Sequence, residues 1–203
     1  MTVAAIRQDA PDRPVIVLDD GEEIQSTPGA VTALRLFVGR ELDPEALEAV
    51  RLESRRALAR ERALTMISRR QMSAKELREK LRQKGVDPET AAWCADWLTE
   101  RGLLDEQAYA AAVVRHYAAK GFGAGKVRAE LARRGVPRSL ADAALEAMPD
   151  GADKLDRLIA ARLKAPGDRD EVRKLSASLY RRGFSAEEIR SALRRVQADF
   201  EEY

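Results

Sequence analysis

The chain has 203 residues, of which 34% are charged, 45% hydrophobic and only 5% aromatic. A single cysteine and a single histidine exclude an intramolecular disulfide, the usual zinc ligand sets and a histidine-based catalytic triad. No apolar run approaches the roughly 18 residues of a membrane-spanning helix, and the N-terminus lacks the features of a secretory signal. We therefore expect a cytoplasmic protein that is not an enzyme and that carries no cofactor or metal. We also expect it to be a monomer.

The N-terminal segment, residues 1–54, is acidic, with 5 basic and 11 acidic side chains. Its first twelve residues are polar, and we expect them to be loose. The β-branched run at 15–18 ends in a turn signal, and residues 22–25 can pair back to complete a β-hairpin. A helix is expected over residues 28–38.

A block that ends in glycine occurs three times and organises the rest of the chain. Gly85, Gly135 and Gly183 lie 50 and 48 residues apart, and a leucine stands four residues before each. Apolar residues follow each glycine with the i, i+3, i+4, i+7 spacing of one helix face. Each glycine thus ends one amphipathic helix and precedes another, and the period leaves room for a third. The sequence predicts a mostly α-helical, elongated tandem array of three three-helix repeats behind a short β-hairpin and helix.

The predicted repeats span residues 55–104, 105–150 and 151–203. The first helix of repeat one is the end of a long helix over residues 44–69, with a break expected near residue 53. Two helices are expected to begin with a capping box, in which a serine is followed three residues later by glutamate. Those boxes are Ser73-x-x-Glu76 and Ser185-x-x-Glu188. Ala63, Leu64 and Ile67 are expected to face inward, and residues 165–167 to form a linker.

Basic residues gather in the body of the chain. Residues 55–104 carry 12 basic and 7 acidic side chains, and the body as a whole is basic. This favours a polyanion or an acidic protein surface as partner, with a merely solubilising surface of mixed sign as the alternative. A dipole interpretation is also open, because a cation at a helix C-terminus gains roughly 0.3–1 kcal/mol from the macrodipole. The candidate binding residues, at and around the helix ends before the glycines, are Arg69, Arg70, Lys75, Lys80, Arg82, Lys84, Lys120, Lys126, Arg128, Arg133, Arg134, Arg181 and Arg182.

Four further features have a structural interpretation beside a functional one. His116 is expected to be a packed or surface side chain rather than a base, and Cys94 a small core residue. The glycine-rich series at 121–126 lacks the spacing of a phosphate-binding loop and predicts a turn between helices. Trp93 and Trp97 lie one helical turn apart. They either fill a seam between repeat one and the N-terminal segment or form an exposed anchor.

An ordered series of motifs resembles the signature of the RecX family. The similarity covers residues 57–148 well and 153–198 more weakly. Tyr109 stands where the family usually has phenylalanine, and Gln107 replaces a frequent arginine. The motifs are Ala63-Leu64-x-x-Ile67-Ser68-Arg69-Arg70-x-x-Ser73-x-x-Glu76-Leu77-x-x-x-Leu81-x-x-Lys84-Gly85, then Gly102-Leu103-Leu104-Asp105-Glu106-x-x-Tyr109-Ala110, then Arg128-x-Glu130-Leu131-x-x-Arg134-Gly135-Val136.

The resemblance implies a non-enzymatic bacterial regulator of the recombinase RecA. The tandem three-helix repeats of this regulator would form a curved rod. Such a protein would lie in the groove of the RecA–DNA filament and restrain ATPase activity, strand exchange and SOS coprotease activity. It would also bind single- and double-stranded DNA with modest affinity. From the residues alone, two other classes stay open. The first is a helical repeat protein that binds nucleic acid without a recombinase partner, and the second is an enzyme with a minimal acid/base site, against which the lack of histidine and cysteine sets argues.

Overall fold

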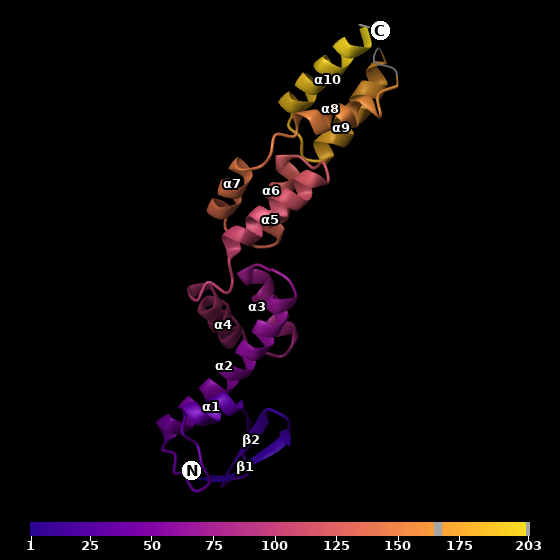
Figure 1. Ribbon diagram of the computed structural model, residues 1–203. Coiled ribbons are helices and arrows are strands. Elements are labelled where there is room, and N and C mark those ends of the chain that lie inside the picture. Colours follow the sequence, from indigo (N-terminus) through magenta and orange to yellow (C-terminus); the bar gives the residue numbers. More distant parts are fainter. Residues whose placement is uncertain (165–167, 202–203) are drawn as a thin grey trace. The chain divides into compact units, whose positions relative to one another are not determined.

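A computed structural model describes residues 1–164 and 168–201, and within these ranges it contains ten helices and three strands (Figure 1). The chain divides into two compact units, Met1–Leu104 and Asp105–Tyr203. The prediction of a mostly helical protein with three three-helix repeats is confirmed. The elongated, curved arrangement of the repeats and their boundaries stay predictions, and the linker expected at 165–167 lies outside the described residues.

The N-terminal segment begins with a three-stranded antiparallel sheet in the order β1-β2-β3. The strands are β1 (Val3–Ala10), β2 (Arg13–Leu18) and β3 (Glu23–Gln25). The pairing of β2 with β3 confirms the predicted hairpin. The expectation of a loose N-terminus is wrong, because β1 pairs with β2 along its length and Val3 is fully buried.

Two helices cover this sheet, α1 (Pro28–Ala33) and α2 (Pro44–Arg69). α1 is shorter than predicted, since Arg35 adopts a left-handed backbone conformation (φ 52°) that a helix cannot continue through. α2 has no break at its middle. The hydroxyls of Ser26 and Ser54 are hydrogen-bonded at 2.9 Å in the buried interior, which ties the end of β3 to the centre of α2.

Repeat one consists of the end of α2 with α3 (Ala74–Gln83) and α4 (Pro88–Glu100). The Ser73 hydroxyl accepts from the Glu76 N–H at 3.1 Å, as expected of a capping box. Cys94 is fully buried in the core of this repeat, as predicted. Ala63 and Ile67 of α2 pack in the core of the repeat, as predicted, but Leu64 is 40% exposed, so the prediction that it faces inward is wrong.

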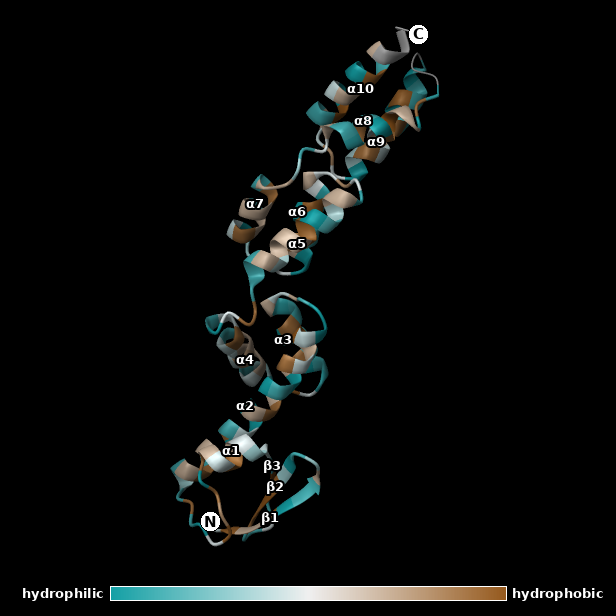
Figure 2. Ribbon diagram, in the orientation of Figure 1, coloured by the Kyte–Doolittle hydropathy of each residue, from teal (hydrophilic) through white to brown (hydrophobic). Residues whose placement is uncertain are grey.

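Repeat two consists of α5 (Glu106–Ala119), α6 (Ala124–Arg133) and α7 (Arg138–Glu146). Repeat three consists of α8 (Ala152–Ala160), α9 (Arg169–Arg181) and α10 (Ala186–Glu201). Hydrophilic and hydrophobic residues alternate around these helices, as an amphipathic packing requires (Figure 2). The capping box at the start of α10 is complete: the Ser185 N–H donates to Glu188 Oε2 at 2.6 Å, and the Glu188 N–H donates to the Ser185 hydroxyl at 3.2 Å.

The three repeat glycines all have positive φ values, between 74° and 91°, as expected of residues that end helices in the left-handed conformation. Gly183 has a second role, because it meets the start of α6. The Gly123 N–H donates to the Arg182 carbonyl at 3.0 Å, and the Gly125 N–H donates to the Gly183 carbonyl at 2.9 Å. A Cβ on Gly183 would lie 2.1 Å from the Lys126 backbone nitrogen. The glycine-rich series is therefore a backbone lock between repeats two and three.

Candidate functional site

An open groove in the first unit is lined by the C-terminal half of α2, by α3 and by the first residue of β2. Its volume is about 920 Å³. Six of its eleven lining residues are cations and only one is acidic, so the groove is suited to an anionic ligand. The lining residues are Arg13, Glu61, Arg62, Thr65, Met66, Arg69, Arg70, Met72, Lys80, Gln83 and Lys84.

The groove has two walls, and helix periodicity explains which side chains of α2 line the first wall and which of α3 line the second. On α2, Arg62, Met66 and Arg69 follow the i, i+4, i+7 spacing of a single face. On α3, Lys80 and Lys84 are four residues apart, at the end where the helix dipole also favours positive charge. The two walls are joined where the Arg62 guanidinium donates to the Lys84 carbonyl at 3.2 Å.

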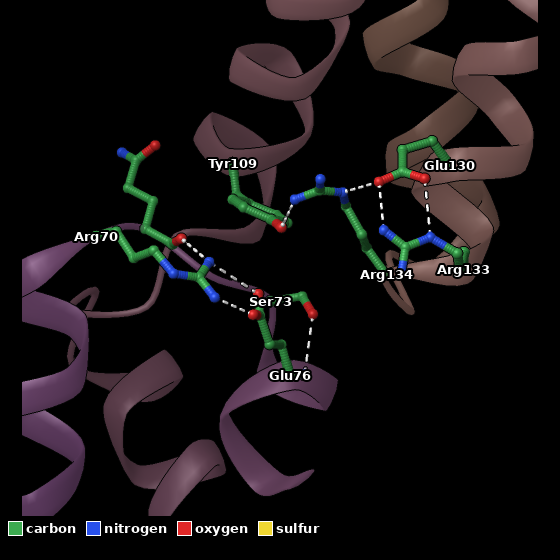
Figure 3. Close-up of polar contacts among 8 residues, drawn as sticks. Arg70, Ser73, Glu76, Tyr109, Glu130, Arg133 and Arg134 are labelled. Carbon is green, nitrogen blue, oxygen red and sulfur yellow. Dashed lines mark hydrogen bonds and ion pairs between the residues drawn. The ribbon is translucent and has the colours of Figure 1, made fainter. Parts of the chain in front are cut away.

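The carboxylates near the groove are already paired with arginines. Glu61 forms an ion pair with Arg13, which reaches across from the start of β2. Glu76 forms an ion pair with Arg70, and Figure 3 shows the Arg70 guanidinium against the Ser73–Glu76 capping box at the start of α3. Because the acidic charges are neutralised within the protein, the remaining cations give the groove a positive field.

Comparison with known proteins places these elements in a family. Models of the first, second and third three-helix domains of RecX match residues 59–98, 105–145 and 157–193. Regulatory protein RecX of Xanthomonas axonopodis pv. citri (strain 306) is 39% identical over 137 residues, which cover 66% of this chain and 85% of that protein. This chain belongs to the RecX family. Regulatory protein RecX of Halorhodospira halophila (strain DSM 244 / SL1) is 34% identical over 147 residues, covering 70% of this chain and 90% of that protein.

Solved structures of RecX proteins share the fold. A crystal structure of regulatory protein RecX, 25% identical in sequence, matches with a TM-score of 0.73 over 97% of this chain and 98% of that one. RecX from Lactobacillus salivarius is 21% identical and matches with a TM-score of 0.63 over 71% of this chain and 97% of that one. The groove is thus built on the first three-helix domain of a RecX fold and its N-terminal segment.

The structure brings together only part of the candidate set in repeat one. Arg69, Arg70, Lys80 and Lys84 line the groove. Lys75 instead pairs with Glu79 at 3.9 Å on the outer face of α3, and Arg82 is exposed outside the groove.

Two groove arginines were missed by sequence reasoning. Arg62 lies two helical turns before Arg69, and that spacing is a signal from which it could have been found. Arg13 carries no such signal, because it reaches the groove only through the packing of the sheet on α2.

In repeat two, the two arginines before Gly135 are held by ion pairs and hydrogen bonds within the repeat. Glu130, 9% exposed, accepts from Arg133 at 2.6 Å and from Arg134 at 2.5 Å, and Arg134 Nη1 donates to the Tyr109 hydroxyl at 2.7 Å (Figure 3). The hydrogen bonds from Arg133, followed by those from Arg134, lower the pKa of Glu130 to about 2. This network anchors the end of α6 to α5, so we assign these two arginines a structural role in repeat two.

The remaining candidates lie in the second unit near the lock between repeats two and three. Arg182 is half-buried, with its guanidinium 5.1 Å from the centre of the Phe122 ring and 3.4 Å from the Lys120 carbonyl. Lys120, Lys126, Arg128 and Arg181 are exposed there, with Arg128 at 3.4 Å from Asp142.

Trp93 and Trp97 fit neither expectation for them. Both are half-buried on α4, 6.3 Å apart between ring centres, and pack on the core of repeat one. Arg56 lies 4.4 Å above Trp93, and Arg101 lies 4.1 Å from Trp97. The Arg56 contact braces α4 on α2, whereas Arg101, the C-cap residue of α4, covers the Trp97 ring within the same helix. Both contacts have a role within the repeat.

The structure shows how the single cysteine and histidine are placed. Burial raises the pKa of the Cys94 thiol to about 11, so it stays protonated and is a poor nucleophile near neutral pH. His116 is an exposed side chain on α5, in agreement with the structural interpretation. In residues 1–164 and 168–201, no cluster of histidine, cysteine and acidic side chains is suited to a metal ion. Over the same residues, no helix is both long and apolar enough to cross a membrane.

Proposed function

We propose that this protein regulates the recombinase RecA by binding the RecA–DNA filament, and that the basic groove of repeat one carries the contact. Membership of the RecX family supports the regulatory role. The observation that supports the site is the groove itself, in which Arg62, Arg69, Lys80 and Lys84 face one open space while the nearby carboxylates are paired.

The proposed action follows from binding alone. A protein that occupies the filament restrains the subunit motions and DNA exchange that the filament needs. We therefore expect inhibition of RecA ATPase activity, strand exchange and SOS coprotease activity, without any catalysis by this protein. Contacts between groove cations and phosphates would release counterions, so part of the affinity should be lost as salt rises, whereas contacts with the recombinase itself should persist.

A matched pair of variants tests the site. Arg69→Gln with Lys84→Gln removes two charges that line the groove, and Lys75→Gln with Arg82→Gln removes two exposed charges from α3 outside it. Inhibition of the single-stranded-DNA-dependent ATPase of RecA should weaken strongly for the groove pair and stay near wild type for the control pair. Each lost phosphate contact should lower the salt slope of binding by about 0.9.

The same experiment separates the alternatives. Equal effects of the two pairs would reject the groove as the contact, and no effect of wild-type protein on the recombinase at saturation would reject the RecA role. A nucleic-acid-binding protein without a recombinase partner is the second candidate, favoured by the cation-lined groove. It predicts that all binding, including that to filaments, is lost between about 50 and 200 mM salt.

A further inference from the structure

The last turn of α9 presents an aromatic side chain to solvent. Tyr180 is 67% exposed, the highest value among the large hydrophobic side chains of the described residues. The repeat explains this exposure, because Leu179 is the fully buried leucine of the block and the next residue must turn away from the core. The equivalent positions in the other repeats hold Arg82 and Ala132, which are also exposed.

Two hollows of different character lie on either side of Tyr180. The first, about 430 Å³, is largely apolar, with Ala177, Ile189 and Leu193 in its lining. The second, about 580 Å³, is shared with α6 and contains Lys126 and Arg128. Tyr180 and Arg181 line both hollows, so they form the ridge between an apolar and a cationic surface.

The cations around this ridge differ in whether a carboxylate of the protein already pairs with them. Among the described residues, no carboxylate lies within 4 Å of the charged groups of Lys126 or Arg181, whereas Arg128 and Arg190 pair with Asp142 and Glu187. Glu188 also lines the second hollow, but its carboxylate is held by the Ser185 N–H of the α10 capping box. The free positive charge is therefore concentrated at Lys126 and Arg181, next to the ring.

The backbone lock fixes this arrangement across two repeats. Tyr180 and Arg181 stand just before Gly183, and Lys126 follows Gly125, whose N–H is bonded to the Gly183 carbonyl. The backbone positions of Tyr180 in repeat three and Lys126 in repeat two are thus fixed relative to one another before any ligand arrives. Such preorganisation lowers the entropic cost of binding.

We propose that Tyr180, with Lys126 and Arg181, is a stacking platform for single-stranded nucleic acid. A base stacks on the exposed ring, and the adjoining phosphates lie against the two cations, which is how proteins bind single strands without reading their sequence. A duplex keeps its base faces stacked inside, so the platform favours single strands. The inference rests on the nucleic-acid part of the proposed function and does not require the recombinase.

The test measures binding of a fluorescent oligothymidylate to the full chain, in the absence of any recombinase. Tyr180→Ala should weaken binding roughly 5- to 150-fold, the range that one lost base–aromatic stack produces. Tyr180→Phe keeps the ring and should bind as wild type. Phe37→Ala is the matched control, since Phe37 is 61% exposed but lies in the acidic N-terminal segment. All variants should keep their melting midpoints, because these side chains are exposed.

An abasic oligonucleotide of equal length decides between stacking and simple charge attraction. Wild-type protein should bind it as weakly as Tyr180→Ala binds oligothymidylate, and Tyr180→Ala should lose nothing further on it. Equal affinity of wild type for the abasic and normal strands would overturn the proposal. So would displacement of the oligonucleotide by an oligoglutamate peptide of equal charge at equal concentration, which would identify an acidic peptide as the ligand. If the proposal fails while RecA inhibition persists, only the platform is rejected.

Discussion

The basic residues before the three repeat glycines occupy equivalent sequence positions but different environments. In repeat one, the Lys84 side chain lines the open groove. In repeat two, Arg134 is bound by a glutamate and a tyrosine. In repeat three, Arg182 lies over an aromatic ring at the lock between repeats. Cations at equivalent sequence positions therefore make different contacts in the three repeats.

The residue just before the buried leucine of each block accounts for much of this difference. That position holds Lys80 in repeat one, Glu130 in repeat two and Ser178 in repeat three. Glu130 reaches forward one helical turn and binds both following arginines, whereas Lys80 adds a further positive charge beside Lys84. One acidic residue thus distinguishes an internal brace in repeat two from the open cationic groove of repeat one.

The largest expected effect comes from the glycine that is locked. Gly183→Ala should lower the free energy of unfolding by roughly 2–5 kcal/mol, because left-handed strain of about 1–2 kcal/mol is joined by an overlap worth about 1–3 kcal/mol. Gly85→Ala is the matched variant, since Gly85 has φ 81° but no atom within 4 Å of an added Cβ. It should lose only the strain. Urea unfolding of both proteins checks this, and equal losses would show that the lock carries no stability.

The glutamate of repeat two should give the next largest effect. Glu130→Gln removes the charge that faces two arginines and should cost about 2 kcal/mol, the scale of a charge-assisted hydrogen bond. Thermal melting at pH 7 measures the loss. Glu146→Gln, on an exposed position of α7, should shift stability by no more than about 0.5 kcal/mol. A melting midpoint for Glu130→Gln as high as that of the control would mean that the network is dispensable.

The same glutamate makes repeat two sensitive to acid. Its pKa is lowered from the usual range to about 2, so its stabilising contribution is present above the unfolded pKa near 4.3 and is lost as pH falls toward 2. About 1–2 kcal/mol should disappear in this window, since the 69% exposure of Arg133 weakens its share of the interaction. Unfolding curves from pH 5 to 2 should show wild type converging on Glu130→Gln. A difference that stays constant across this range would contradict the assignment.

The smallest effect on stability is expected in repeat one. Lys80→Glu places a carboxylate one helical turn before Lys84, as Glu130 stands before Arg134, and should change the free energy of unfolding by about 0.5 kcal/mol or less. Binding to the RecA–DNA filament should nevertheless weaken, because the groove loses one positive charge and gains a negative one. Filament binding and urea unfolding of the same protein test the pair of expectations. If Lys80→Glu bound the filament as tightly as wild type, the groove would not be the contact with the filament.

Local features of the fold were predictable, because they are determined by neighbours in sequence. The caps at Ser73 and Ser185 and the left-handed conformation of Gly85 follow from the chemistry of a single helix end. β1 was not predictable in this way, since its outer half is polar and the strand is formed by pairing with β2.

The candidate site shows the same division. The i, i+4 spacing of Lys80 and Lys84 was sufficient to place both on one wall of the groove. The pairing of Glu61 with Arg13 depends on tertiary packing, which no local pattern encodes. Glu130 was predictable in principle, because its arginines follow at i+3 and i+4.

The arginine-stacked tryptophans of α4 give the protein an optical asymmetry. The chain has two tryptophans, and both belong to the first unit, where they lie against Arg56 and Arg101. Emission excited selectively from tryptophan therefore reports on repeat one alone, while circular dichroism records the helices of all three repeats. Superimposable melting curves from the two signals would mean that both units unfold together, and an earlier or later emission change would reveal a chain whose halves come apart separately.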